Sequence, residues 1–111
     1  MVRAYKPHIP KDVGEIMDQL GFMTLKSPKF IDRTGYFPQQ NIDTVFFQLN
    51  EGLQLIRGKL GGDLYLKLMD MSDRMRAHFE ADPEGKTDDT RKGCAIIREM
   101  DELLKEKVRK S

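Results

Sequence analysis

The sequence predicts an all-α protein, a four-helix up-down bundle that forms a single domain over residues 1–111. Apolar residues recur at spacings of three and four along most of the chain, which is the period of an amphipathic helix. Glycine and proline divide these stretches into four segments. The last three segments are joined by short connections, so neighbouring helices are expected to run antiparallel.

The first helix is expected over residues 10–20. Pro10 fits the start of a helix, because proline has no N–H to donate and its φ is already helical. Ile16 and Leu20 follow on one face. Gly21 stands where helices commonly end, so we place the end of this helix there.

A long connection rich in aromatic residues is expected between the first and second helices. Residues 32–35 have the composition of a type I turn, with Asp first and Gly fourth. A loop with many large apolar side chains should pack against the helices. A short β-hairpin over residues 23–31 is an alternative for part of it. The apolar residues concerned are Phe22, Leu25, Phe30, Ile31, Tyr36 and Phe37.

The second helix is expected to begin after Asn41 or Asp43, since either side chain can accept a hydrogen bond from a free N–H group of the first turn. Its apolar residues continue to Leu60. Gly61 and Gly62 then end the helix.

The third and fourth helices are also delimited by sequence signals. Asp63 is expected to cap the third helix, and Asp82 followed by Pro83 ends it, because proline disfavours helical geometry in the preceding residue. The fourth helix is expected from about Asp88 to Arg109, with acidic residues at its start and basic residues at its end. This charge distribution complements the helix dipole.

Composition is typical of an ordinary globular protein and excludes several classes. Of the 111 residues, 39% are hydrophobic and 33% are charged, and the net charge is only +1. A disordered chain would have a lower hydrophobic fraction and a higher net charge. A protein that binds nucleic acid or an anionic membrane usually has a marked excess of basic residues. Cys94 is the only cysteine, so no disulfide can form within the chain. Together with the absence of an apolar leader or spanning segment, this predicts a cytoplasmic protein with no membrane partner.

Several apolar side chains lie outside the single apolar face that each helix would direct toward the core. On a helical wheel of about 100° per residue, Phe47 and Leu55 point away from the main stripe of the second helix, and Leu66 and Met69 do the same on the third. The apolar face of the fourth helix covers roughly half of its circumference. Either the first helix and the aromatic connection cover these faces, or a partner protein or second copy does.

Metal and nucleotide sites are not supported by any motif. His78 and Asp82 share a helix face, but zinc sites bring three or four protein ligands. The segment around Gly85-Lys86-Thr87 lacks the earlier glycine and the preceding strand of a phosphate-binding loop. The same segment lacks the glycine and glutamate positions of a calcium loop. We therefore predict no cofactor and no metal.

Catalytic chemistry has one weak candidate. Cys94 lies among apolar positions of the fourth helix and is expected to be a core residue. Asp32, Arg33 and Tyr36 form a polar cluster within the aromatic connection, and loops often carry function. An enzyme with a site near residues 30–37 is therefore an alternative, although turn formation already explains Asp32.

A nucleic-acid-binding regulator is a second alternative. The helices carry several basic residues, and a helix-turn-helix through Gly61 and Gly62 is conceivable. Acidic residues are interleaved with the basic ones along the same helices, which cancels the field that a phosphate backbone would experience.

The leading hypothesis is a small non-enzymatic helical protein that acts by binding another protein, or a second copy of itself as a homo-oligomer. A regulator, an adaptor and a toxin-neutralising protein are all compatible with it. The predicted interaction residues are large, apolar or aromatic, as contact residues commonly are. They are Tyr36, Phe37, Phe47, Leu55, Leu66 and Met69.

Overall fold

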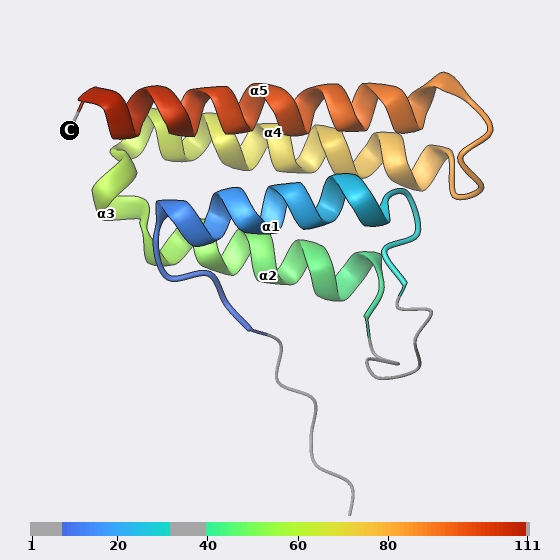
Figure 1. Cartoon of the computed structure of the whole chain (residues 1–111), viewed down its shortest axis with the longest axis horizontal. Coiled ribbons are helices and arrows are strands. Elements are labelled where there is room, and N and C mark those ends of the chain that lie inside the picture. The colour runs from blue at the N-terminus through green and yellow to red at the C-terminus, as the bar shows by residue number, and fades with distance from the viewer. Residues whose placement is uncertain (1–7, 32–39, 111) are drawn as a thin grey trace, which may run out of the picture.

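The computed structural model describes residues 8–31 and 40–110 (Figure 1). Within these ranges the chain is helical and contains no strand. The helices are α1 (Val13–Lys26), α2 (Ile42–Leu55), α3 (Arg57–Leu60), α4 (Gly62–Ala81) and α5 (Asp88–Lys110). The all-α prediction is confirmed for the described part of the chain.

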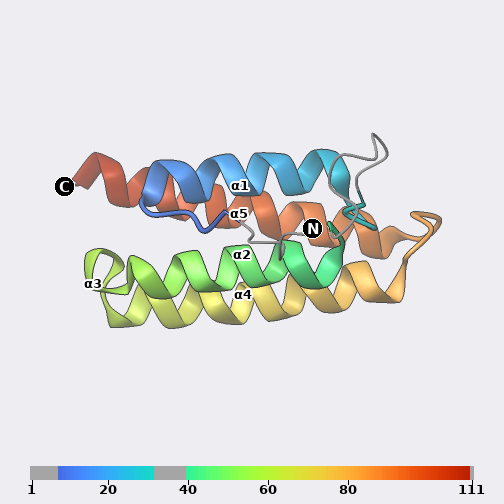
Figure 2. The same cartoon turned by 90° about the horizontal axis from the view of Figure 1, so that it is seen from below.

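The long helices α1, α2, α4 and α5 lie side by side with their axes roughly aligned, and consecutive long helices run in opposite directions (Figures 1 and 2). Helix α1 packs against α2 and α5, and α4 packs against the same pair of helices. The single turn α3 links α2 to α4 and contacts both.

Helix α1 is longer than the sequence predicted and shifted toward the C-terminus. Asp12 caps it by accepting a hydrogen bond from the N–H of Glu15 at 2.8 Å. The helix passes through Gly21 because Met23 continues the buried face of Ile16 and Leu20. Packing of this face outweighs the weak helix preference of glycine. The predicted end at residue 20 was therefore wrong.

The β-hairpin alternative for residues 23–31 is also wrong, because this segment is the last turn of α1 followed by a tight turn. Phe30 then enters the core. Its ring makes edge-on contacts with Phe46 of α2 and Phe79 of α4, with centroid distances of 5.8 and 5.1 Å. Phe30 has a φ of 59°, an uncommon value outside glycine, and burial of the whole ring compensates for its cost.

The predicted second helix is divided at Ile56. Asn41 is the cap, since its side-chain oxygen accepts the N–H of Thr44 at 3.0 Å. Helix α2 ends at Leu55, and α3 follows after the non-helical Ile56. This break lets Leu60 turn into the core and places the Arg57 guanidinium 5.1 Å from the centre of the Tyr65 ring on α4.

Helix α4 begins after Gly61, whose φ of 86° suits glycine. Asp63 lies inside the first turn and is not the cap that the sequence predicted. A partly buried hydrogen bond of 2.7 Å from the hydroxyl of the buried Ser72 to the side-chain oxygen of Asn50 joins α4 to α2. Helix α5 begins at Asp88, as predicted, and extends to Lys110.

The core lies between the long helices and includes residues from each of them and from Phe30. Helix α5 has its wide apolar face covered by α1 on one side and α4 on the other. The excess apolar residues of this helix are thus explained by packing within one chain. Those that are buried are Ile96, Ile97, Met100 and Leu104.

Candidate protein-interaction surface

The outer face of α2 exposes two large apolar side chains. The opposite face carries Phe46, Leu49 and Leu53, which are fully buried. Because successive helix residues are rotated by about 100°, Phe47 and Leu55 are directed away from that buried face. Their side chains are 49% and 64% exposed, as the helical wheel predicted.

These two residues border a shallow hollow of about 390 Å³, which we call the α2 hollow and which is lined by Ile9, Phe47, Glu51, Gln54 and Leu55. Ile9 comes from the segment before α1. The side chain of Gln48 donates a hydrogen bond of 2.8 Å to the carbonyl of His8 and holds this segment against α2.

The same segment packs closely at Gly52. A Cβ atom at that position would lie 2.8 Å from Ile16 Cδ1 and 3.1 Å from the Pro10 ring. Glycine therefore allows the chain before α1 to approach α2, and this approach builds one wall of the hollow.

The electrostatics of the hollow are set by one carboxylate. Glu51 forms no hydrogen bond or ion pair with any residue that the structure describes. Helix α2 contains no lysine or arginine, and its other acid, Asp43, pairs with Arg76 of α4. The α2 hollow is thus an apolar surface with a single uncompensated negative charge.

The remaining predicted interaction residues do not line the α2 hollow. Leu66 on α4 is 65% exposed, in agreement with the wheel. Met69 is partly buried and packs against the core. Tyr36 and Phe37 lie outside the described residues.

Sequence reasoning missed three exposed apolar side chains. Leu25 is 83% exposed on the last turn of α1, which the predicted helix did not include. Ile31 lies near it, and both line a hollow of about 320 Å³ beside Pro28 and Pro83. Val108, near the end of α5, is also exposed. An extended periodicity search through Gly21 would have placed Leu25 on the outside of the helix.

A wider groove of about 660 Å³ lies between α4 and α5. Met71 and Leu103 contribute its apolar part. Charged side chains of both signs line the rest, so this groove has no dominant charge. They are Lys67, Arg74, Arg98, Glu99, Glu102, Glu106 and Arg109.

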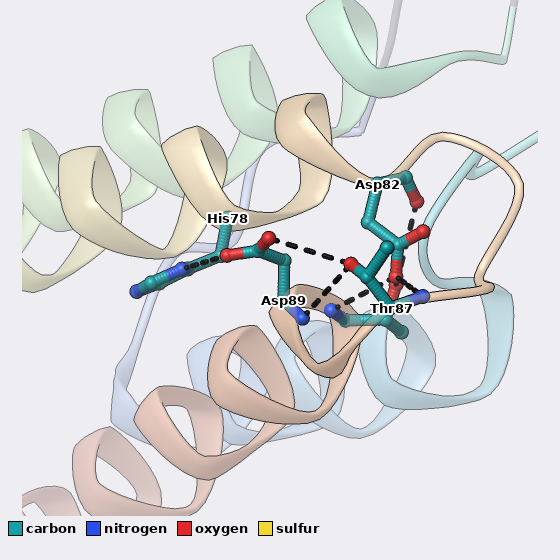
Figure 3. A network of polar contacts seen from close by, with 5 residues as sticks. His78, Asp82, Thr87 and Asp89 are labelled. Atoms are coloured by element: carbon teal, nitrogen blue, oxygen red, sulfur yellow. Dashed lines mark hydrogen bonds and ion pairs between the residues drawn. The ribbon is translucent and has the colours of Figure 1, made fainter.

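The loop between α4 and α5 contains a polar network centred on Asp82 (Figure 3). The nearly buried Asp82 carboxylate accepts hydrogen bonds from the N–H groups of Lys86, Thr87 and Thr90, and from the Thr90 hydroxyl at 2.7 Å. Thr90 belongs to the first turn of α5, where N–H groups lack helical partners. Asp82 therefore caps α5 from the end of α4.

These hydrogen bonds change the acidity of the carboxyl group. Burial alone would raise the pKa of Asp82, but the bonds from the Thr90 side chain and from three backbone N–H groups outweigh burial. Together they lower the pKa from 3.8 to about 2. Asp82 is held as an anion for the structure of the loop.

His78 lies beside this network and was considered in the sequence as a metal ligand. Its Nδ1 is 2.9 Å from Asp89 Oδ1, and this hydrogen bond is the main cause that lowers the pKa of Asp89. A His–carboxylate pair can orient a catalytic base, but no serine or cysteine in the described ranges bonds to His78. Cys94 instead contacts Ser27, with Sγ and Oγ 3.5 Å apart.

Other kinds of site find no support in residues 8–31 and 40–110. No group of three or more His, Cys, Asp or Glu side chains there is arranged to hold a metal ion. None of the helices described is both long and apolar enough to cross a bilayer. The polar cluster of Asp32, Arg33 and Tyr36 falls outside the described residues.

Comparison with known proteins adds no functional information. No protein-family model matches the chain, and neither curated proteins nor solved structures give a significant match.

Proposed function

We propose that this protein is a non-enzymatic helical protein that acts by binding another protein through the α2 hollow. The observation that carries the proposal is the exposure of Phe47 and Leu55 on either side of one hollow in a chain whose core is already well filled. Removing such side chains from water on binding contributes roughly 25 cal/mol per Å².

The composition of the hollow fits the centre of an interface. Specific interfaces cover about 800 Å² on each partner, with a few aromatic or large apolar residues contributing most of the affinity. Phe47 and Leu55 would be these central residues. Leu66, Met69, Tyr36 and Phe37 stay predicted interaction residues.

We also propose an architecture and a cellular location for this protein. The helix order and contacts favour a four-helix up-down bundle in which α3 is a connecting turn, with a long aromatic-rich connection between α1 and α2. The free thiol of Cys94, the only cysteine, is consistent with a reducing, cytoplasmic compartment.

The nucleic-acid alternative is weakened by the pairing of basic side chains. Several of them are neutralised by carboxylates of the same chain, which reduces their attraction for phosphates. The pairs are Lys29 with Glu84, Arg74 with Asp70, Arg76 with Asp43 and Glu80, and Lys105 with Asp101 and Glu102.

The proposal is tested by binding measurements on a surface variant. Wild-type protein is used to capture a partner from a lysate of the source cells, and the identified partner is then purified and titrated by calorimetry. Replacing Phe47 and Leu55 together by serine is expected to weaken this binding by about tenfold or more, because two central apolar contacts are lost.

Leu25→Ser is the matched control, since Leu25 is equally apolar and even more exposed but lies on α1. It should leave the affinity within about twofold. Circular dichroism and thermal unfolding should show that all variants retain the wild-type fold. Equal affinity of wild type and the Phe47/Leu55 variant would contradict the proposal.

A further inference from the structure

We infer that the α2 hollow selects a protein segment that presents a lysine or arginine flanked by apolar side chains. This inference rests on the proposed function and specifies the chemistry of the partner.

First, Glu51 lies between the two apolar side chains of the hollow. Phe47, Glu51 and Leu55 are each four residues apart on α2, so they follow one another along one strip of the helix surface. All three line the α2 hollow. The carboxylate therefore lies between two apolar side chains, and a partner that covers them must also cover the charge.

Second, no lysine, arginine or histidine within residues 8–31 and 40–110 forms an ion pair with Glu51. A carboxylate covered by a partner without a compensating charge would lose hydration, which is strongly unfavourable. A partner ammonium or guanidinium group at this place would replace the lost hydration with a charge-assisted hydrogen bond. Gln54 also lines the hollow, and its side-chain carbonyl oxygen can accept a further hydrogen bond from the same cationic group.

Third, a second copy of this chain is disfavoured as the occupant of the α2 hollow. A two-fold symmetric contact places the same patch on both sides of the interface. Pairing of two α2 hollows would bring Glu51 toward its own counterpart, and α2 supplies no lysine or arginine to separate the two carboxylates. Like charges brought together in a partly dehydrated contact repel.

The experiment is a peptide selection that needs no native partner. Random linear peptides of about 16 residues, long enough to span α2 as a helix, are displayed on phage and selected on the immobilised full chain. Peptides that also bind the Phe47→Ser/Leu55→Ser double variant are removed. The survivors are expected to be enriched in Lys or Arg with apolar residues at helical spacing around it.

The role of Glu51 is then measured directly. For the strongest synthetic peptide, Glu51→Gln should raise Kd by about tenfold or more at low salt, because it removes the charge while it keeps the shape. Added salt should weaken wild-type binding more than it weakens binding to the Glu51→Gln variant. Glu99→Gln on α5, in the groove between α4 and α5, is the matched control and should leave Kd unchanged.

The outcomes separate this inference from the proposed function. Peptides that depend on Phe47 and Leu55 but are neutral or acidic, and that bind Glu51→Gln as well as wild type, overturn the inference and leave the proposed function intact. Failure to recover any peptide that depends on the hollow contradicts the proposed function itself.

The other occupants are tested with the pure protein. Sedimentation velocity is expected to show a monomer. A wild-type dimer that dissociates in the Phe47→Ser/Leu55→Ser variant would overturn the inference in favour of a second copy. Binding of duplex DNA that the same double variant abolishes would overturn it in favour of a nucleic acid.

Discussion

At the scale of single residues, a close approach of α4 and α5 depends on Gly93. A Cβ atom at this position would lie 2.6 Å from two atoms of the fully buried Phe79 ring. The ring also packs against Phe30 and has little freedom to move. Gly93→Ala should therefore destabilise the fold by about 1–3 kcal/mol, as overpacking of a core does.

Gly21→Ala is the control for Gly93→Ala. Gly21 is also inside a helix, but a Cβ atom there would meet nothing within 4 Å. Alanine should stabilise α1 by about 0.5–1 kcal/mol through helix preference alone. Urea unfolding followed by circular dichroism measures both variants. A stabilised Gly93→Ala protein would show that α4 and α5 do not pack this closely.

Asp82 gives the fold a predictable dependence on pH. Its folded pKa of about 2 lies below the ordinary value of 3.8. The ionised carboxylate therefore contributes fully to the free energy of unfolding at pH values above 3.8. This contribution is lost as the pH falls through about 2. Asp82→Asn should lower stability at neutral pH, and its difference from wild type should shrink as the pH falls from about 5 to 2.

The measurement for Asp82 is a series of urea unfolding curves at several pH values. Asp73→Asn is the control, because Asp73 is an exposed acid on the same helix. Its difference from wild type should stay small at every pH. If Asp82→Asn lowers the free energy of unfolding by the same amount at about pH 2 as at neutral pH, the ionised carboxylate does not have the proposed capping role.

At the scale of helices, Leu66 and Met69 distinguish a free face from a packed one on α4. Leu66 is 65% exposed, whereas Met69 contacts the core. Leu66→Glu should change the melting temperature little, while Met69→Glu should cost about 1–3 kcal/mol, because a charge would enter a partly buried place. Thermal unfolding of the two single variants tests this difference. Equal destabilisation by both would mean that Leu66 is also covered.

Helix boundaries were predictable where a local signal sets them, and were missed where packing sets them. Asn41 and Asp88 mark starts because a side chain or a charge near the first turn satisfies local requirements that the sequence shows directly. The end of α1 depends on burial of Met23, and the break at Ile56 depends on placing Leu60 in the core. Both are tertiary effects, which local spacing does not contain.

At the scale of the whole molecule, the helical wheel correctly identified Phe47, Leu55 and Leu66 as exposed. It did not anticipate the partial burial of Met69, because a helical wheel gives the direction of a side chain from its own axis and not the positions of the neighbouring helices. The contribution of Ile9 could not be predicted either, since it depends on the bond between Gln48 and the His8 carbonyl. The uncompensated charge of Glu51 likewise became visible only when the surroundings of α2 were known.

The central claim is that the outer face of α2 is where another protein binds. Titrating ¹⁵N-labelled protein with its purified partner and recording amide shifts tests it most directly. The largest changes should fall on Ile9 and on the α2 residues from Phe47 to Leu55, while amides along the groove between α4 and α5 stay unchanged. Changes concentrated in that groove or around Leu25, with α2 unaffected, would contradict the claim.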